Sequence, residues 1–269
     1  AKCGIIGYVG SDVYGRFCIK DFNDHGIDTT YLKIDEDKDT PFSLVLSEKQ
    51  TKGRNIIYHS GNARRLSPNE LNKDYITSAK YLHISQVNDA TYTAAKWARE
   101  GDVKVVFDAD SYNPKIDEMI PLIDVFIASE FYYASRFNND ENFQKNCTDI
   151  MSMGPEIVVF TLGSRGCVGM DKHTFFTQPA FNVDVVDTVG AGDVYHGAFI
   201  FGLLNGWDVS YTALFANAVS AIKCTRIGGR AAIPDLETVC RFMETGRIDY
   251  TEIDKRVAYY RSEAIWNIK

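Results

Sequence analysis

The sequence lacks the cysteine patterns of a metal site or of a disulfide scaffold. Its six cysteines are scattered along 269 residues, with no Cys-x-x-Cys pair and no histidines clustered beside them. We therefore expect reduced thiols and a cytoplasmic protein. Long apolar runs are missing as well, since none approaches the roughly 20 residues that a membrane-spanning helix needs. No membrane partner is expected.

An excess of positive charge is also missing. The formal net charge is −7 at pH 7, so the chain has little with which to neutralise the phosphates of nucleic acids or anionic lipids. We expect no nucleic-acid partner. The hydrophobic content of 45% is enough for a large core in one main domain.

A dinucleotide-binding fingerprint is absent too. Gly4, Gly7 and Gly10 lie near the start of the chain, but their spacing differs from Gly-x-Gly-x-x-Gly. A Rossmann-type oxidoreductase is therefore the less favoured alternative.

What the sequence does contain is a regular alternation of short β-branched runs with stretches of helical length. Runs at 81–85, 103–108, 125–129 and 157–161 predict strands of a mostly parallel sheet covered by helices on both faces, an α/β fold. Ligands bind at the carboxyl ends of such strands. Polar residues at or just after these ends are Gln86, Asp108, Glu130 and Thr161.

A second pattern interrupts this alternation. Residues 40–46 alternate with period two, a polar turn follows, and 54–58 returns as a strand, which predicts an inserted hairpin. We assign 34–60 to this part and 1–33 with 61–269 to the α/β core. Most inserted hairpins have no role in catalysis.

The stretch Asp187-Thr-Val-Gly-Ala-Gly-Asp193 lies between an expected strand at 181–186 and an apolar run at 194–204 with helical spacing. Glycine permits a sharp bend and close approach of the backbone to a ligand. The free N–H groups of a helix N-terminus suit an anion, and Asp193 there suits a base that takes a proton from an attacking hydroxyl. The alternative is that Asp193 is an ordinary helix cap.

The string from Asp187 to Phe199 resembles the C-terminal signature of the ribokinase-like carbohydrate kinases, the PfkB family. The resemblance implies a ribokinase-like three-layer sandwich with a β lid, and ATP- and Mg²⁺-dependent phosphorylation of a sugar or sugar-derivative hydroxyl. It implies that Asp193 is the catalytic base and that the amides of Gly190, Ala191 and Gly192 form the anion hole. A non-catalytic nucleotide- or sugar-binding relative is the main alternative.

The resemblance also implies roles for other positions. Thr161, Gly163 and Gly166 would form a turn beside the nucleotide phosphates, although a plain hairpin turn gives the same pattern. Asn217 would lie near the adenine, unless neighbouring backbone satisfies it. Asp187 with the loop around Gly228 would hold a monovalent cation such as K⁺, and Glu130 is the only carboxylate near the expected Mg²⁺ position.

The substrate side is less defined. The candidates for contacts with the sugar are Arg54, Gln86, Asp108 and Asp193. The sequence Asp108-Ala109-Asp110 slightly favours a modified sugar such as a fructosamine as the substrate. Family members usually open with one further βαβ unit, which we expect to be missing before residue 1. A homodimer formed through the lid is a further expectation.

Overall fold

The core of the molecule is a six-stranded sheet. The computed structural model describes residues 1–48 and 54–262, with Arg54 described by its backbone only. The sheet order is β10-β9-β8-β7-β6-β5. Neighbouring strands from β5 to β8 are parallel, and β9 and β10 are antiparallel additions at one edge. The strands are β5 (Tyr81–Ile84), β6 (Lys104–Ala109), β7 (Val125–Ser129), β8 (Ile157–Thr161), β9 (Cys167–Met170) and β10 (Phe175–Gln178).

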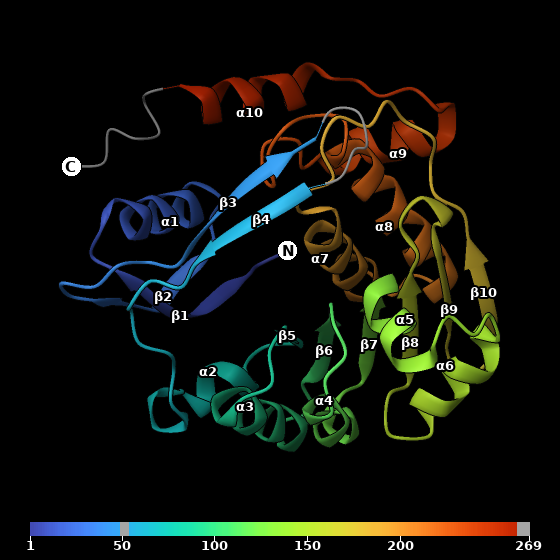
Figure 1. Ribbon diagram of the computed structural model, residues 1–269, viewed down its shortest axis with the longest axis horizontal. Helices are drawn as coiled ribbons and strands as arrows, with labels where there is room; N and C mark the ends of the chain where they lie inside the picture. The colour runs from blue at the N-terminus through green and yellow to red at the C-terminus, as the bar shows by residue number, and fades with distance from the viewer. Residues whose placement is uncertain (49–53, 263–269) are drawn as a thin grey trace.

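The central strands are apolar on both faces because helices cover both faces. In β6, Val105, Val106 and Phe107 are at most 1% exposed although their side chains alternate in direction. One core cluster joins the sheet to the helices that precede β9, and a second joins it to α7 and α8. The expected three-layer α/β sandwich, visible in Figure 1, is confirmed.

The helices between residues 73 and 245 are distributed between these two layers. One layer contains α2 (Lys73–Thr77), α3 (Asp89–Glu100), α4 (Lys115–Met119), α5 (Glu130–Phe137) and α6 (Phe143–Met151). The other contains α7 (Ala191–Leu204), α8 (Val209–Lys223) and α9 (Leu236–Thr245). Short 3₁₀ turns in the described part of the chain are η1 (Pro68–Glu70), η2 (Ile120–Leu122) and η3 (Gly163–Arg165).

The first part of the chain forms a second, two-stranded sheet. β1 (Gly4–Gly10) and β2 (Asp28–Asp35) are parallel and are connected by α1 (Val13–Asp24). Asp12 caps α1 by accepting the Gly15 N–H over 2.8 Å, and it also accepts the Thr40 hydroxyl over 2.7 Å. The cap therefore also fixes the start of the next segment.

That segment is the expected hairpin. β3 (Phe42–Ser47) pairs antiparallel with β4 (Arg54–His59) in a register that places Ser47 opposite Arg54. The predicted polar turn falls mainly on 49–53, outside the described residues. Figure 1 shows the hairpin near α7, and a hydrogen bond from Ser47 to Asp187 places its end beside the signature stretch.

The C-terminal helix α10 (Thr251–Arg261) returns to the first helix of the chain. Tyr260 donates a hydrogen bond to Asp21 of α1 over 2.7 Å, and Lys20 of α1 donates to Tyr259 over 2.8 Å. Arg230 forms an ion pair with the same Asp21. Nowhere in the described chain is a helix both long and apolar enough to cross a membrane.

One expected strand is wrong. Residues 181–186 form an irregular segment instead of a strand. Its end is fixed from outside the sheet, because the N–H groups of Val186 and Asp187 both donate to the carbonyl of Cys224, over 2.8 and 3.1 Å. Alternating apolar residues predicted a strand here, but the contact with the end of α8 determines the conformation.

Candidate functional site

The signature turn is built around Gly190, the N-cap of α7. Its φ is +78°, a left-handed conformation that favours glycine. A Cβ atom at this position would lie 2.8 Å from the carbonyl oxygen of Gly229. Glycine is therefore required twice, by the backbone angle and by the close approach of the loop.

The helix that follows begins with N–H groups that have no acceptor within the helix itself. The N–H of Ala191 already donates to the carbonyl of Thr188 over 3.2 Å, so that amide of the expected anion hole has an internal acceptor. The amides of Gly192 and Asp193 belong to the first turn, where an α-helix offers no acceptor. Beyond its chain neighbours and its own helix backbone, a Cβ on Gly192 would meet no described atom within 4 Å. Open space therefore adjoins the backbone at Gly192.

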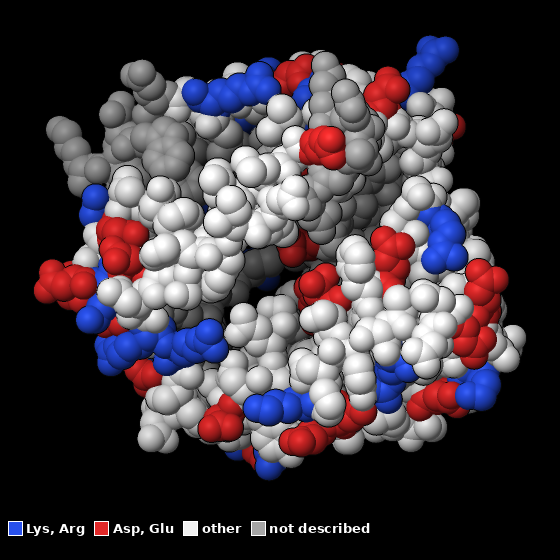
Figure 2. Space-filling model, viewed as in Figure 1, with Lys and Arg blue, Asp and Glu red and all other residues white. Residues whose placement is uncertain are grey.

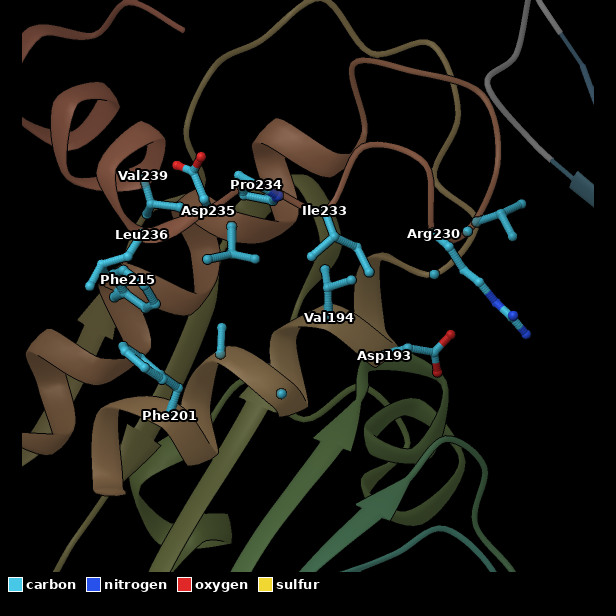
Figure 3. Close-up of a pocket in the computed structure, with 16 residues that line it drawn as sticks. Asp193, Val194, Phe201, Phe215, Arg230, Ile233, Pro234, Asp235, Leu236 and Val239 are labelled. Atoms are coloured by element: carbon cyan, nitrogen blue, oxygen red, sulfur yellow. The ribbon is translucent and has the colours of Figure 1, made fainter. Parts of the chain in front are cut away.

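Asp193 is exposed and lies at one end of a cavity of about 570 Å³. Figure 3 shows Asp193 and Arg230 together at one end and Phe201, Phe215 and Leu236 toward the other. The cavity thus has a charged end and an apolar end. Its lining residues are Val189, Gly190, Asp193, Val194, Gly197, Ala198, Phe201, Phe215, Val219, Gly229, Arg230, Ile233, Pro234, Asp235, Leu236 and Val239.

The apolar end has the chemistry of a slot for a flat, weakly polar ring. Gly197 lines this slot and leaves it open, because it has no side chain. A Cβ at this position would have no described atom within 4 Å, apart from its own helix backbone and its chain neighbours. Most of the lining comes from α7, from α8 and from the segment 229–239, which sequence reasoning missed. The mixture of small and apolar residues in that segment carries no motif that would identify it.

Asp187 is buried behind the turn, and both of its carboxylate oxygens accept hydrogen bonds. Oδ1 accepts the hydroxyl of Ser47 over 2.9 Å and the N–H of Val189 over 3.1 Å, and Oδ2 accepts the N–H of Gly228 over 2.9 Å. Burial acts to raise the pKa of Asp187, but these donors and the charge of Lys223 outweigh it, and the pKa is lowered. Asp187 is therefore ionised at neutral pH.

These contacts do not fit the expected monovalent cation. Both carboxylate oxygens of Asp187 face donor hydrogens, and its main-chain carbonyl accepts the Lys223 ammonium over 3.0 Å. Gly228, the expected loop partner, contributes its N–H to Asp187. A positive group of the chain itself thus lies at this position.

The expected phosphate turn lies at the end of β8. Thr161 donates its hydroxyl to the carbonyl of Ala128 over 3.3 Å, within the sheet. Gly163 has a φ of +57° and lies under Glu130, whose Oε1 would be 3.1 Å from a Cβ at this glycine. Gly166 is buried, and a Cβ there would lie 2.1 Å from the carbonyl of Gln178. Gly166 thus serves the hairpin packing, while Gly163 brings the backbone next to an exposed carboxylate.

Asn217 does not line the cavity. Its amide donates to the carbonyls of Gln178 and Pro179, over 3.2 and 3.0 Å, as in the alternative in which backbone satisfies it. Phe215 and Val219 of the same helix line the cavity instead.

The substrate candidates lie at the carboxyl edge of the sheet. Asp108 Oδ1 is 3.2 Å from Nε2 of the buried His196, one helical turn beyond Asp193. Burial acts to raise the pKa of Asp108, but His196 and His83 outweigh it and the pKa is lowered. Potential ligand atoms of these three residues lie within 4.8 Å of one another. Gln86 is exposed beyond β5, and the Arg54 side chain lies outside the described residues.

Figure 2 shows a hollow near the centre of this face, with acidic side chains on its rim. Comparison with Figure 1 places the hollow between the β1 to β4 unit and the carboxyl edge of β5 and β6, next to α7. A small polar molecule in this hollow would lie between the hairpin and the first turn of α7.

The chain is similar to known proteins in both sequence and fold. The sequence pattern described as pfkB family carbohydrate kinase matches residues 1–236. The 5-dehydro-2-deoxygluconokinase of Bacillus subtilis (strain 168) is 28% identical over 268 residues, covering 90% of this chain and 81% of the relative. That of Geobacillus thermodenitrificans is 27% identical over 271 residues, covering 90% and 79%.

Solved structures show the same fold. A ribokinase from Thermotoga maritima has a TM-score of 0.76 at 24% identity, covering 90% of this chain and 82% of that one. A protein from E. coli described as a ribokinase II, solved with ATP and Mg²⁺, has a TM-score of 0.82 at 21% identity, covering 91% and 83%. The expected ribokinase-like fold is confirmed.

Proposed function

Because the chain belongs to the pfkB family of carbohydrate kinases, we propose that it transfers the γ-phosphoryl group of ATP to a sugar or sugar-derivative hydroxyl at the first turn of α7. The chain is a phosphotransferase with an alcohol group as acceptor. The observation that carries the proposal is the position of Asp193, an exposed carboxylate beside the first-turn amides of α7 and at the charged end of the cavity.

In this mechanism Asp193 accepts the proton of the acceptor hydroxyl as its oxygen attacks phosphorus. The amides of Gly192 and Asp193, with the N-terminal end of the α7 dipole, stabilise the charge that builds on the phosphoryl oxygens. Gly190 holds the turn in the required conformation. Ala191, whose N–H already has an acceptor, contributes through the backbone it fixes.

The nucleotide would place its base at the apolar end of the cavity and its phosphates toward Asp193 and Arg230. Support comes from the lining, which is apolar around Phe201 and Phe215 and charged at the other end (Figure 3). Mg²⁺ would neutralise phosphate charge when bound. The exposed carboxylate of Glu130, beside the left-handed Gly163, offers the kind of oxygen ligand that Mg²⁺ takes. Thr161 and Gly163 remain proposed neighbours of the nucleotide phosphates.

The hairpin β3–β4 is proposed as the lid. It belongs to the segment 34–60, and Ser47 at the end of β3 contacts Asp187 behind the catalytic turn. Closure would exclude water from the phosphoryl group. The hairpin also exposes apolar side chains, with Leu44 at 53%, Ile57 at 57% and Tyr58 at 62%. A second copy of the chain docking on this surface would bury them, so we include a homodimer through the lid in the proposal.

The acceptor is proposed to bind in the hollow between lid and sheet, with Asp108, Gln86 and Arg54 as candidate contacts besides Asp193. The names of the curated relatives put 5-dehydro-2-deoxygluconate first among acceptors to be tested. Fructosamines, fructose and ribose complete the panel. A cytoplasmic location, where ATP is supplied, is part of the same proposal.

The test is a coupled assay of ADP release with this panel, run on the wild type and on Asp193→Asn. We expect turnover with at least one acceptor, and a loss of at least about 10³-fold in kcat for the variant. ATP binding measured by calorimetry should be preserved. ATP binding without turnover in the wild type would favour the non-catalytic alternative, and a variant as active as the wild type would exclude Asp193 as the base.

A further inference from the structure

A fully buried lysine lies behind the catalytic turn. Lys223, the last residue of α8, has a relative exposure of 0%, and its Nζ donates to the carbonyl oxygen of Asp187 over 3.0 Å. An ammonium group in a protein interior is costly unless an opposite charge accompanies it. The buried carboxylate of Asp187 supplies that charge.

The position of this pair relates it to phosphoryl transfer. Asp187 begins the turn that ends at Gly190, and the first-turn amides of α7 follow directly. The carboxylate alone would weaken the attraction of this turn for an anion. The ammonium of Lys223 offsets that charge and is held in place before any substrate binds, which is the condition for electrostatic preorganisation.

The oxygens of Asp187 are poorly suited to bind a dissociable cation. The Asp187 carbonyl oxygen accepts Lys223, and the two carboxylate oxygens accept Ser47, Val189 and Gly228. A metal cation would have to share these oxygens with the donor hydrogens that already face them. It would also be repelled by the ammonium, because like charges a few ångströms apart interact strongly at low dielectric.

We propose that the Lys223 ammonium takes the place of a monovalent cation behind the catalytic turn, so that phosphoryl transfer by this chain does not depend on K⁺. The inference rests on the proposed function, because it assigns to Lys223 a role in positioning the amides that hold the phosphoryl group. Lys223 is a positioning residue, since it acts through Asp187 and the turn.

The experiment compares the wild type with Lys223→Met, which keeps an unbranched side chain of similar length and removes the charge. Lys255→Met, at an exposed position on α10, is the matched control. Each protein is assayed for turnover, ATP binding and Tm in chloride salts of K⁺, NH₄⁺ and tetramethylammonium. The ionic strength is held near 0.1 M, where screening is equal.

Wild type and control should show the same turnover in all three salts. Lys223→Met should lose about tenfold or more in kcat in tetramethylammonium, and K⁺ or NH₄⁺ should restore much of it. A purely structural role of Lys223 would give a loss that no cation restores, and this result would overturn the proposal. Strong stimulation of the wild type by K⁺ would overturn it as well, and that comparison holds even where the variant fails to fold.

The two proposals can fail separately. If the wild type phosphorylates no acceptor, the proposed function has failed, and Tm and ATP binding still decide the role of Lys223. We then expect K⁺ to raise the Tm and the ATP affinity of Lys223→Met relative to tetramethylammonium, with no such difference in the wild type. Equal salt responses of the two proteins would refute the inference.

Discussion

The hydroxyl of Ser47 donates a hydrogen bond to Oδ1 of Asp187 over 2.9 Å, joining two residues that are 140 positions apart. Ser47 ends the first strand of the hairpin, and Asp187 begins the signature turn. The hairpin is therefore bonded directly to the segment that positions the amides proposed to hold the phosphoryl group.

Removing that hydroxyl should loosen the hairpin. We expect Ser47→Ala to cost about 1 kcal/mol of hairpin docking, or roughly a fivefold loss in kcat/KM. Hydrogen exchange of 42–47 should become faster in the variant. Ser43→Ala, an exposed position on the same strand, is the control and should leave both measurements unchanged. An unaltered kcat/KM in Ser47→Ala would show that the bond has no part in lid closure.

Two substitutions at Gly197 should separate the stability of α7 from ligand binding in the cavity. Gly197→Ala should stabilise α7 by about 0.5–1 kcal/mol, because glycine is unfavourable inside a helix and the added Cβ meets open space. Gly197→Leu should fill the cavity and weaken ATP binding by at least about tenfold, with the Tm maintained. Thermal unfolding and calorimetry measure the two effects. Undiminished ATP affinity in the leucine variant would place the nucleotide elsewhere.

The Asp187 carboxylate should make stability sensitive to acid. Its pKa is lower in the folded chain, so the unfolded chain binds the proton more readily, and the contribution is present at neutral pH and lost as the pH falls below about 4. Asp187→Asn should have a smaller loss of unfolding free energy between about pH 5 and pH 3. At pH 7 it should be less stable by at least about 2 kcal/mol, because an amide faces donors and the Lys223 charge loses its partner.

Denaturant unfolding at several pH values measures this difference. Asp184→Asn, at an exposed position three residues earlier, is the control and should follow the wild type. Identical pH profiles for Asp187→Asn and the wild type would contradict the assignment.

Asp108 should act on the acceptor and not on ATP. Asp108→Asn keeps an oxygen near His196 but removes the charge, and we expect the KM for the acceptor to rise by about tenfold, the value of one hydrogen bond to a charged group. The KM for ATP should stay the same. Asp110→Asn, exposed just beyond the same strand, should have little effect. A rise in the KM for ATP alone would move Asp108 out of the acceptor site.

Local patterns predicted the layers of the fold well, because strands buried on both faces read as continuous apolar runs. The runs at 125–129 and 157–161 became β7 and β8 with these bounds. The strand predicted at 181–186 was wrong, because the end of this segment is held by the distant carbonyl of Cys224. Sequence periodicity carries no information about such a contact.

The candidate site was predictable where a short string defines it. The turn around Gly190 and the exposed carboxylate of Asp193 follow from the signature stretch itself. Long-range partners did not follow from it. Asn217 was assigned by its helical face although two distant carbonyls engage it, and Lys223 was overlooked because a lysine ending a helix is usually solvated.

One carboxylate links the two ends of the chain. Asp21 of α1 holds Arg230, which lines the cavity, and also accepts Tyr260 of α10. A shift of α1 toward an acceptor in the hollow would therefore pull on the wall of the cavity proposed to hold the nucleotide. Affinity for one substrate should then depend on occupancy by the other, and thermodynamic reciprocity requires the same factor in both directions.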